Sequence, residues 1–155
     1  MKPNIFFLLT CSLLLSFTLI AQRANVSDIV RHSGKTTLAD NQFTNGKLTK
    51  SKFDSLIQLP IVAHDSNNKA YPVHSFVLIF IERGLYEDTA GRPIILPDYF
   101  AVNSDEGKIP ADWIQLLKER AKDGATVLIN NVKAHYGDKK NTPFYTEPIR
   151  IIITK

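Results

Sequence analysis

The sequence contains very little cysteine: Cys11 is the single example among 155 residues. Cys11 lies inside an uncharged apolar run over residues 5–20, which follows Lys2 near the N-terminus. A basic residue before such a run is typical of a secretory signal peptide, and about 16 apolar residues are fewer than the roughly 20 that span a bilayer. The small residue Ala21 predicts cleavage behind it, so residues 1–21 are expected to be a signal peptide.

Cleavage at this point would place the remaining chain in the periplasm or outside the cell, with no membrane span and no thiol. A chain without cysteine has no disulfide, even in an oxidising compartment, and it has neither a thiolate nucleophile nor a sulfur ligand for a metal. Its stability must therefore come from an apolar core. About 134 residues are enough to build one.

The excess of positive over negative charge is also small. The chain has 19 Lys and Arg against 15 Asp and Glu, and the formal net charge is +4. Acidic and basic residues alternate along the sequence, whereas a nucleic-acid-binding protein gathers its basic residues into a stripe that neutralises several phosphates. We therefore expect no nucleic acid among the partners.

The sequence lacks the local patterns that mark common active sites. It has no glycine-rich phosphate loop and no Gly-x-Ser-x-Gly frame around a nucleophile. The four histidines, His32, His64, His74 and His135, include no pair at the spacing of four that prearranges a metal site on a helix. These absences predict no catalytic residue, no metal and no cofactor, and the protein is expected not to be an enzyme.

One alternative stays open: a small secreted hydrolase or ligand-binding protein with a site near His64 and His74. Asp65 directly follows His64, as a carboxylate that orients a base would, and Asp98 is a further candidate acid. Because no local frame joins these residues, only the fold could assemble such a site.

The composition divides the mature chain near residue 44. Residues 22–43 are polar and show little periodicity, so they predict an arm that carries at most one short strand or turn. Residues 44–155 alternate between apolar segments and turn signals, which predicts a single domain.

Three segments in the first part of this domain predict regular structure. Thr49 precedes apolar residues at helical spacing and favours one or two helical turns. A strand is expected over Leu56–Ala63, at a sheet edge or bent, because Pro60 cannot donate to a ladder. A central strand covered on both faces is expected over Val73–Ile81, with Gly84 as its end.

The second part predicts more strands and one clear helix. Arg92–Val102 favours one or two short edge strands broken at Pro97. Pro110 opens the helix, because proline is tolerated in a first helical turn. Ala125–Ala134 and Tyr145–Thr154 predict a hairpin. Short strands with one short helix in a connection indicate a mainly β fold, an antiparallel β-sandwich.

Several segments of the expected domain match the pattern of a known family. They are Gly46–Lys50, Tyr71–Leu78 with its Ser-Phe pair, Asp123–Ala134 with its Asn-Asn-Val-Lys-Ala end, and the closing strand Ile149–Ile153. Together they resemble the C-terminal domain of the GldM-type proteins of gliding motility and type IX secretion. The order Asp123-Gly124 departs from the family, which has Gly-Asp at this place.

The resemblance implies an immunoglobulin-like sandwich in the periplasm that contacts an envelope or outer-membrane-associated protein. We therefore predict a non-catalytic protein–protein interaction domain associated with gliding motility or type IX secretion. Aromatic side chains in irregular segments are the candidate anchors, because exposed Tyr and Phe often dominate an interface. These candidates are Tyr86, Tyr99, Tyr136 and Phe144.

Overall fold

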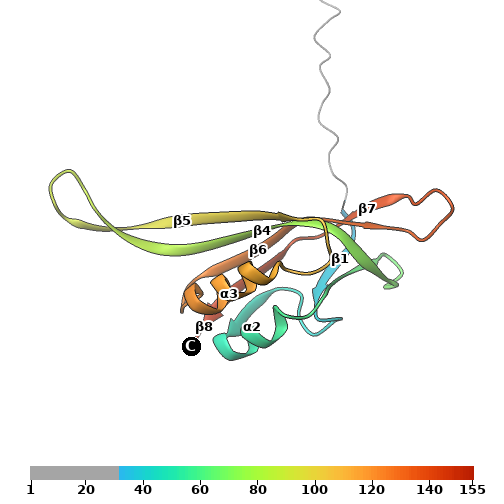
Figure 1. Cartoon of the computed structure of the whole chain (residues 1–155), viewed down its shortest axis with the longest axis horizontal. Helices are drawn as coiled ribbons and strands as arrows, with labels where there is room; N and C mark the ends of the chain where they lie inside the picture. Colours follow the sequence, from blue (N-terminus) through green and yellow to red (C-terminus); the bar gives the residue numbers. More distant parts are fainter. Residues whose placement is uncertain (1–31) are drawn as a thin grey trace, which may run out of the picture. The chain divides into compact units, whose positions relative to one another are not determined.

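The computed structural model describes residues 32–155, so the predicted signal peptide and the first part of the polar arm lie outside the described residues. The described chain is mainly β, with one mixed eight-stranded sheet and two helices (Figure 1). No helix in this part of the chain is long and apolar enough to cross a membrane. The elements are β1 (His32–Leu38), β2 (Gly46–Thr49), α2 (Lys50–Leu56), β3 (Ile61–Asp65), β4 (Ala70–Glu87), β5 (Pro93–Ser104), α3 (Ala111–Arg120), β6 (Thr126–His135), β7 (Pro143–Thr146) and β8 (Ile149–Thr154).

The sheet closes on itself. β1 pairs with β3, β3 with the start of β4, β4 with β6, β6 with β7, and β7 returns to β1. β5 extends the sheet from β4, while β8 and then β2 extend it from β6. The pairings of β1 with β7 and of β2 with β8 are parallel. The prediction of purely antiparallel pairing is therefore wrong at these two places, because β1 and β2 join strands from the far end of the chain, which no hairpin connects to them.

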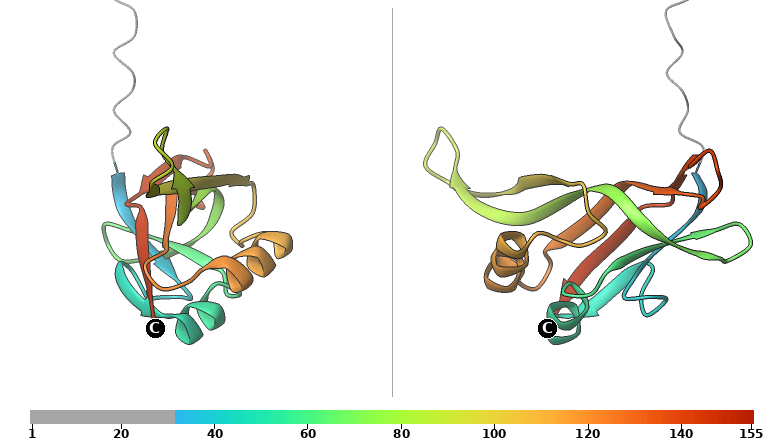
Figure 2. Two further views of the ribbon diagram at one scale, coloured as in Figure 1. Left: turned by 90° about the vertical axis from the view of Figure 1, so that its left-hand side faces the viewer. Right: turned by 45° about the vertical axis from the view of Figure 1, so that its right-hand side comes forward.

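The core lies between the sheet and the two helices, which cover the same side of it (Figures 1 and 2). Alternate side chains of a strand point to one face, and Phe76, Leu78 and Phe80 of β4 are at most 2% exposed. Leu117 of α3 and Phe53 of α2 belong to the same buried cluster. Full burial of each such side chain contributes about 1.5–3 kcal/mol to folding.

The opposite face of β4 is only half-buried. Val77, Ile79 and Ile81 alternate with the core residues and keep an intermediate exposure. Within the described residues no second layer covers them (Figure 1). The expectation that β4 is covered on both faces is thus wrong, and the sheet presents one apolar face outward.

β4 and β5 are longer than the sequence pattern predicts. Gly84 does not end β4, which pairs with β5 as far as the pair Glu87 and Pro93. Pro97 does not break β5, where it stands opposite Arg83. β5 is an edge strand, as predicted, and an edge strand accepts a proline whose nitrogen faces away from its neighbour.

The folded unit begins earlier than the predicted boundary at residue 44. Residues 32–38, assigned to the polar arm, form β1 between β3 and β7. This segment looks polar in the sequence because it contains Thr36 and Thr37. Both threonines are nevertheless buried, and their hydroxyls are hydrogen-bonded. The Oγ1 of Thr36 lies 2.6 Å from that of Thr146, and the Oγ1 of Thr37 lies 3.2 Å from the His64 ring.

Other predicted elements need smaller corrections. The turns expected after Thr49 form the helix α2, so the described chain has two helices where one was predicted. Pro60 precedes β3 and does not lie inside it, and β3 has neighbours on both sides. The expected final strand is split around Pro148 into β7 and β8, because proline cannot donate to the ladder. The predicted helix behind Pro110 and the antiparallel pairing of β6 with both last strands are confirmed.

Candidate functional site

The ends of β4 and β5 project beyond the rest of the sheet. β6 accompanies β4 as far as the pair Ile81 and Thr126, whereas β5 continues to Glu87 and Pro93. Residues 82–87 and 93–98 therefore pair only with each other among the described strands, and they form a two-stranded hairpin that extends past α3 (Figures 1 and 2). We call residues 82–98 the projecting hairpin.

Large apolar side chains are concentrated on this hairpin and next to it. Leu85 is 74% exposed, Tyr99 67% and Ile95 65%, and Leu96 and Tyr86 exceed 40%. They make up five of the six large hydrophobic residues that are exposed in the described chain; Leu59 is the sixth. Single exposed apolar residues are ordinary, but a contiguous group of them marks a contact surface.

The two faces of the projecting hairpin differ. On the helix side, Glu82 forms an ion pair with Arg120 of α3, and the Arg120 guanidinium lies 4.4 Å from the centre of the Phe100 ring. The opposite side, which we call the outer face, has no such neighbour among the described residues. It carries Leu85, Ile95, Pro97, Tyr99, Ala101 and the half-buried Val77, Ile79, Ile81 and Leu128.

Charge on the outer face is sparse and mostly positive. Arg83 stands in the row itself, between the Leu85–Ile95 and Ile81–Tyr99 pairs, and Arg150 of β8 and Lys47 of β2 lie towards the β2 edge of this face. The one acidic position in the same row, Glu87, lies beyond Leu85 beside the turn. The outer face is thus an apolar surface with one guanidinium group inside it and further positive groups towards the β2 edge.

The turn at the tip is held by its own hydrogen bonds. The Asp88 carboxylate accepts bonds from the backbone amides of Ala90 and Arg92, and it forms a 2.8 Å ion pair with the Arg92 side chain. The bonds from Arg92 lower the pKa of Asp88 below its ordinary value. Gly91 takes a φ of 73°, a backbone conformation that favours glycine. The hairpin is therefore ordered before any partner arrives.

A second contact braces the hairpin behind the tip. The Tyr86 hydroxyl donates to the Asp98 carboxylate, and this hydrogen bond raises the pKa of Tyr86 above its ordinary value. The Tyr86 ring also lies across Gly84, where a Cβ would collide with both Tyr86 and Asp98. A side chain at position 84 would therefore displace the Tyr86 ring and the Asp98 carboxylate, and Gly84 does not interrupt the strand.

The predicted anchor residues fall into two groups. Tyr86 and Tyr99 lie exposed on β4 and β5 at the projecting hairpin. Tyr136 and Phe144 lie beside Tyr71, at the opposite end of β4. The prediction of Phe144 as an exposed anchor is wrong, because this ring is 4% exposed and stacks on Tyr136 with their centres 4.3 Å apart. Tyr136 is half-buried in the same cluster.

Sequence reasoning missed Leu85, Ile95 and Leu96. The sequence does contain a signal for an exposed hairpin. Residues 87–92 form a polar turn, and in the segments on either side of it consecutive residues are apolar, so apolar side chains fall on both faces of each strand. The predicted elements were a strand that ends at Gly84 and short edge strands broken at Pro97, so Leu85 fell between them. The register of β4 with β5 pairs Leu85 with Ile95 and Leu96 with Gly84 in the projecting hairpin.

The residues of the hydrolase alternative do not form a common site. His64 is 2% exposed, and its ring nitrogens lie 3.2 Å from Thr37 Oγ1 and 3.5 Å from the Asn68 carbonyl oxygen. The neighbouring Asp65 accepts bonds from the Asn67 and Lys69 amides, which closes the turn between β3 and β4. Asp98 is held by Tyr86 on the projecting hairpin.

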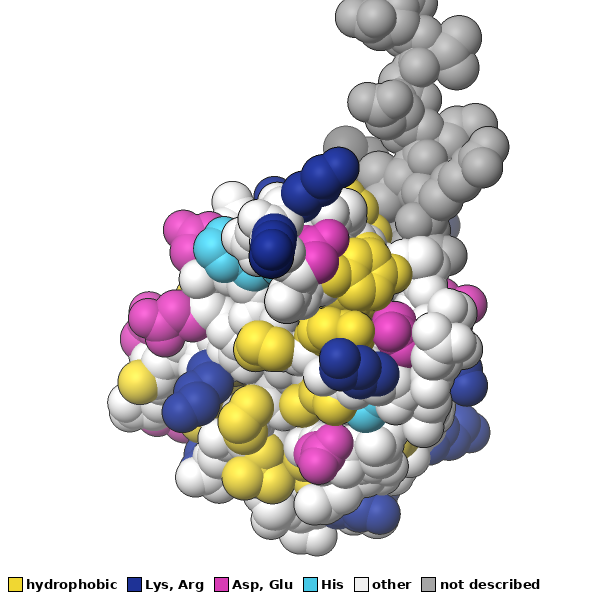
Figure 3. Space-filling view, turned by 90° about the vertical axis from the view of Figure 1, so that its right-hand side faces the viewer, with side chains coloured by type: hydrophobic (Ala, Val, Ile, Leu, Met, Phe, Trp, Pro, Cys, Tyr) yellow, Lys and Arg dark blue, Asp and Glu magenta, His cyan; other side chains and the backbone are white. Residues whose placement is uncertain are grey.

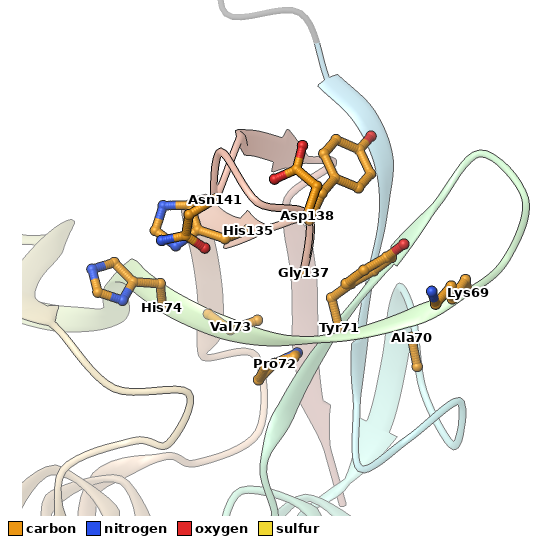
Figure 4. A pocket seen from close by; sticks show the side chains of 11 residues that line it. Lys69, Ala70, Tyr71, Pro72, Val73, His74, His135, Gly137, Asp138 and Asn141 are labelled. Atoms are coloured by element: carbon orange, nitrogen blue, oxygen red, sulfur yellow. The ribbon is translucent and has the colours of Figure 1, made fainter.

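His74 lies elsewhere, in a cavity of about 660 Å³ at the end of the folded unit opposite the projecting hairpin (Figures 3 and 4). The strands beside it are the start of β4 and the hairpin of β6 and β7, and His135 of β6 faces the same space. Figure 3 shows apolar side chains in the middle of this end, with charged groups around them. His64 is not among the residues that line this cavity.

Comparison with models of known protein families finds no match to this chain, and comparison with curated proteins finds none either.

Proposed function

We propose that this protein is a non-catalytic interaction domain that binds a partner protein through the outer face of its projecting hairpin. The observation that carries the proposal is the exposure of the paired Leu85 and Ile95, and of Tyr99 further along the same face, on an ordered ribbon. A few anchor residues, most often Trp, Tyr and Arg, carry most of the binding energy in protein interfaces. Because the turn and the Tyr86–Asp98 contact already order the hairpin, binding loses little conformational entropy there.

The side chains of the outer face indicate the chemistry of the partner. The apolar side chains suit aliphatic or aromatic residues, and Arg83 within the row and Arg150 of β8 suit carboxylates. A second copy of the chain is a poorer match, because its own outer face would bring arginines and few acids. The proposed partner surface is therefore apolar and carries acidic residues.

Side-chain contacts are the proposed mode of binding, and strand addition is not. The open edge of β5 carries Pro93 and Pro97, which have no N–H group to offer to an added strand. Leu85 and Ile95 point out of the sheet plane, where a partner can cover them without using the edge.

The proposed compartment and system follow from the sequence. We propose that the chain is exported, is cleaved after Ala21 and acts in the periplasm on an envelope or outer-membrane-associated protein. The GldM-type resemblance supports an immunoglobulin-like domain that serves gliding motility or type IX secretion. Export predicts a mature N-terminus at Gln22, which mass spectrometry of the periplasmic fraction would detect; an intact Met1 in the membrane fraction would contradict it.

Site-specific photocrosslinking tests the binding face. A photoreactive residue at position 85 or 99 is expected to crosslink one envelope protein, identified by mass spectrometry, in living cells of the source organism. The matched control is position 59, because Leu59 is an exposed hydrophobic residue that does not belong to the hairpin. Equal crosslinking from position 59, or crosslinks at 85 and 99 only to a second copy of the chain, would refute the proposal.

Substitution provides the second arm of the test. Leu85→Ser is expected to weaken capture of the crosslinked protein at least tenfold, while Leu59→Ser leaves capture unchanged. Both variants should melt like the wild type, because exposed substitutions usually change stability by less than about 0.5 kcal/mol. Unchanged capture by Leu85→Ser would refute the assignment of the outer face.

A further inference from the structure

The sheet brings together two histidines that are far apart in the sequence. Val73 of β4 pairs with Ala134 of β6 in antiparallel register, and His74 and His135 lie diagonally across this pair, one residue after each partner. The register shifts between Val73 and Ser75, so His74 lies at an irregularity of β4, and such irregularities re-aim side chains. As a result the two imidazole rings lie with their centres 4.9 Å apart and their planes at 42°.

Both rings are accessible from the cavity at this end of the molecule. His74 is exposed and His135 is half-buried. Figure 4 shows the two rings side by side at one end of the cavity, with the Asn141 amide next to His135 and with Lys69 at the other end. His64 differs, because it is buried and both of its ring nitrogens face hydrogen-bond partners.

The carboxylate nearest to this pair in the cavity lining is already engaged. Asp138 accepts bonds from the backbone amide and the hydroxyl of Thr142, each at 2.9 Å. These bonds lower the pKa of Asp138 and close the turn between β6 and β7. The donor set of the site is thus two imidazole nitrogens, with no thiolate and no available carboxylate in the lining.

We propose that His74 and His135 together bind one divalent transition-metal ion, such as Zn²⁺ or Ni²⁺. Imidazole is a ligand that suits Zn, Ni and Cu, whereas Mg²⁺ and Ca²⁺ require oxygen ligands. With metal–nitrogen bonds of about 2.0–2.1 Å and tetrahedral angles, the centres of two bound imidazoles lie roughly 5 Å apart, close to the observed separation. Two protein ligands leave further positions for water, for the Asn141 amide or for a group from another molecule.

This metal site is independent of the proposed partner-binding face. His74 lies near the start of β4 and Leu85 near its end, and the two surfaces share no residue. A metal bound here would link the start of β4 to the end of β6, beside the hairpin of β6 and β7.

Titration calorimetry on the untagged mature protein tests the proposal, with Zn²⁺ and Ni²⁺ as probes and Mg²⁺ as the hard-cation comparison. We expect one ion per chain for each transition metal and no heat of binding for Mg²⁺. His74→Ala and His135→Ala should each lower the affinity for Zn²⁺ at least tenfold, because either change removes one of two ligands. Lys69→Ala, at the other end of the same cavity, is the matched control and should retain wild-type affinity.

Two further measurements distinguish metal binding by His74 and His135 from metal binding elsewhere on the protein. Zn²⁺ should shift the imidazole NMR signals of His74 and His135 and leave those of the buried His64 in place. Affinity should fall as the solution is acidified, because a metal ligand must be deprotonated. Wild-type affinity in either single histidine variant, or an equal response to Mg²⁺, would overturn the proposal. Circular dichroism of the variants should match the wild type, and a variant that is unfolded is replaced by His74→Gln or His135→Gln.

Discussion

The Tyr86 hydroxyl donates a hydrogen bond to the Asp98 carboxylate across the projecting hairpin, at a site where the Tyr86 ring also covers Gly84. The bond joins β4 to β5 beyond the reach of β6, where the two strands have no other strand beside them in the described chain. A two-stranded ribbon is only marginally stable by itself. This contact and the bonds of Asp88 therefore explain how the hairpin stays ordered while its apolar residues are exposed.

The Tyr86–Asp98 bond predicts a change in tyrosine titration. Ionisation of Tyr86 would lose its bond to Asp98 and bring two negative charges together, so the bond raises the pKa of Tyr86. Asp98→Asn should lower that pKa towards the ordinary value. Ultraviolet titration measures it, and Tyr86→Phe identifies which of the five tyrosines is responsible. An Asp98→Asn titration curve that overlays the wild type would show that the bond does not form in solution.

The turn at the tip should loosen in acid. The pKa of Asp88 is lower in the folded protein than its ordinary 3.8 because of the bonds from Arg92. The bonds therefore contribute fully above the unfolded-state value and are lost as the pH falls through the lower, folded-state value. The protection of the Ala90 and Arg92 amides from hydrogen exchange, measured relative to the intrinsic exchange rate at each pH, should fall in that range. Asp88→Ala should lack this protection at every pH, and protection that persists in this variant would contradict the assignment.

Core truncations should separate fully buried from half-buried residues. Phe76→Ala is expected to cost about 3–5 kcal/mol and Leu117→Ala about 2–5 kcal/mol, because both side chains are at most 2% exposed. Trp113 is only half-buried at the start of α3, so Trp113→Ala should cost less than Phe76→Ala. Denaturant melts measure these differences. A loss below about 1 kcal/mol for Phe76→Ala would mean that β4 packs differently.

The threonine pair between β1 and β7 should show coupling. Thr36→Val would leave the fully buried hydroxyl of Thr146 without its partner, at a cost of about 1–3 kcal/mol. Thr146→Val should cost less, because Thr36 keeps its bond to the Glu147 carbonyl. The double variant should be no less stable than Thr36→Val alone, since it removes the orphaned group. Simple additivity of the two losses in denaturant melts would argue against the buried pair.

Elements that depend on local chemistry can be predicted from the sequence alone. Pro110 and the apolar spacing behind it predicted α3, and alternation in Ala125–Ala134 predicted β6. Helix entry and strand alternation are properties of neighbouring residues, so a single sequence displays them. The exposed positions of Tyr86 and Tyr99 were predicted as well, from their place in segments of irregular composition.

Features that depend on distant pairing were not readable. The place of β1 inside the sheet was not predicted, because its buried threonines look polar until Thr146 and His64 supply their hydrogen-bond partners from elsewhere in the chain. Phe144 looked like a loop aromatic until Tyr71 and Tyr136 enclosed it. In both cases burial is decided by residues that are remote in sequence.

The sequence by itself determined that the described chain is mainly β, because alternation and turn chemistry are written into neighbouring residues. Only the tertiary structure decided which apolar residues stay outside. Ile79 and Leu85 belong to the same alternating set of β4, yet Ile79 has β5 and β6 on its two sides and is half-buried. β6 ends before the hairpin does, so Leu85 lacks this second neighbour in the described chain and is exposed. Long-range pairing also placed His74 beside His135. The register of two strands determines which of their side chains become neighbours, and spacing along the sequence does not.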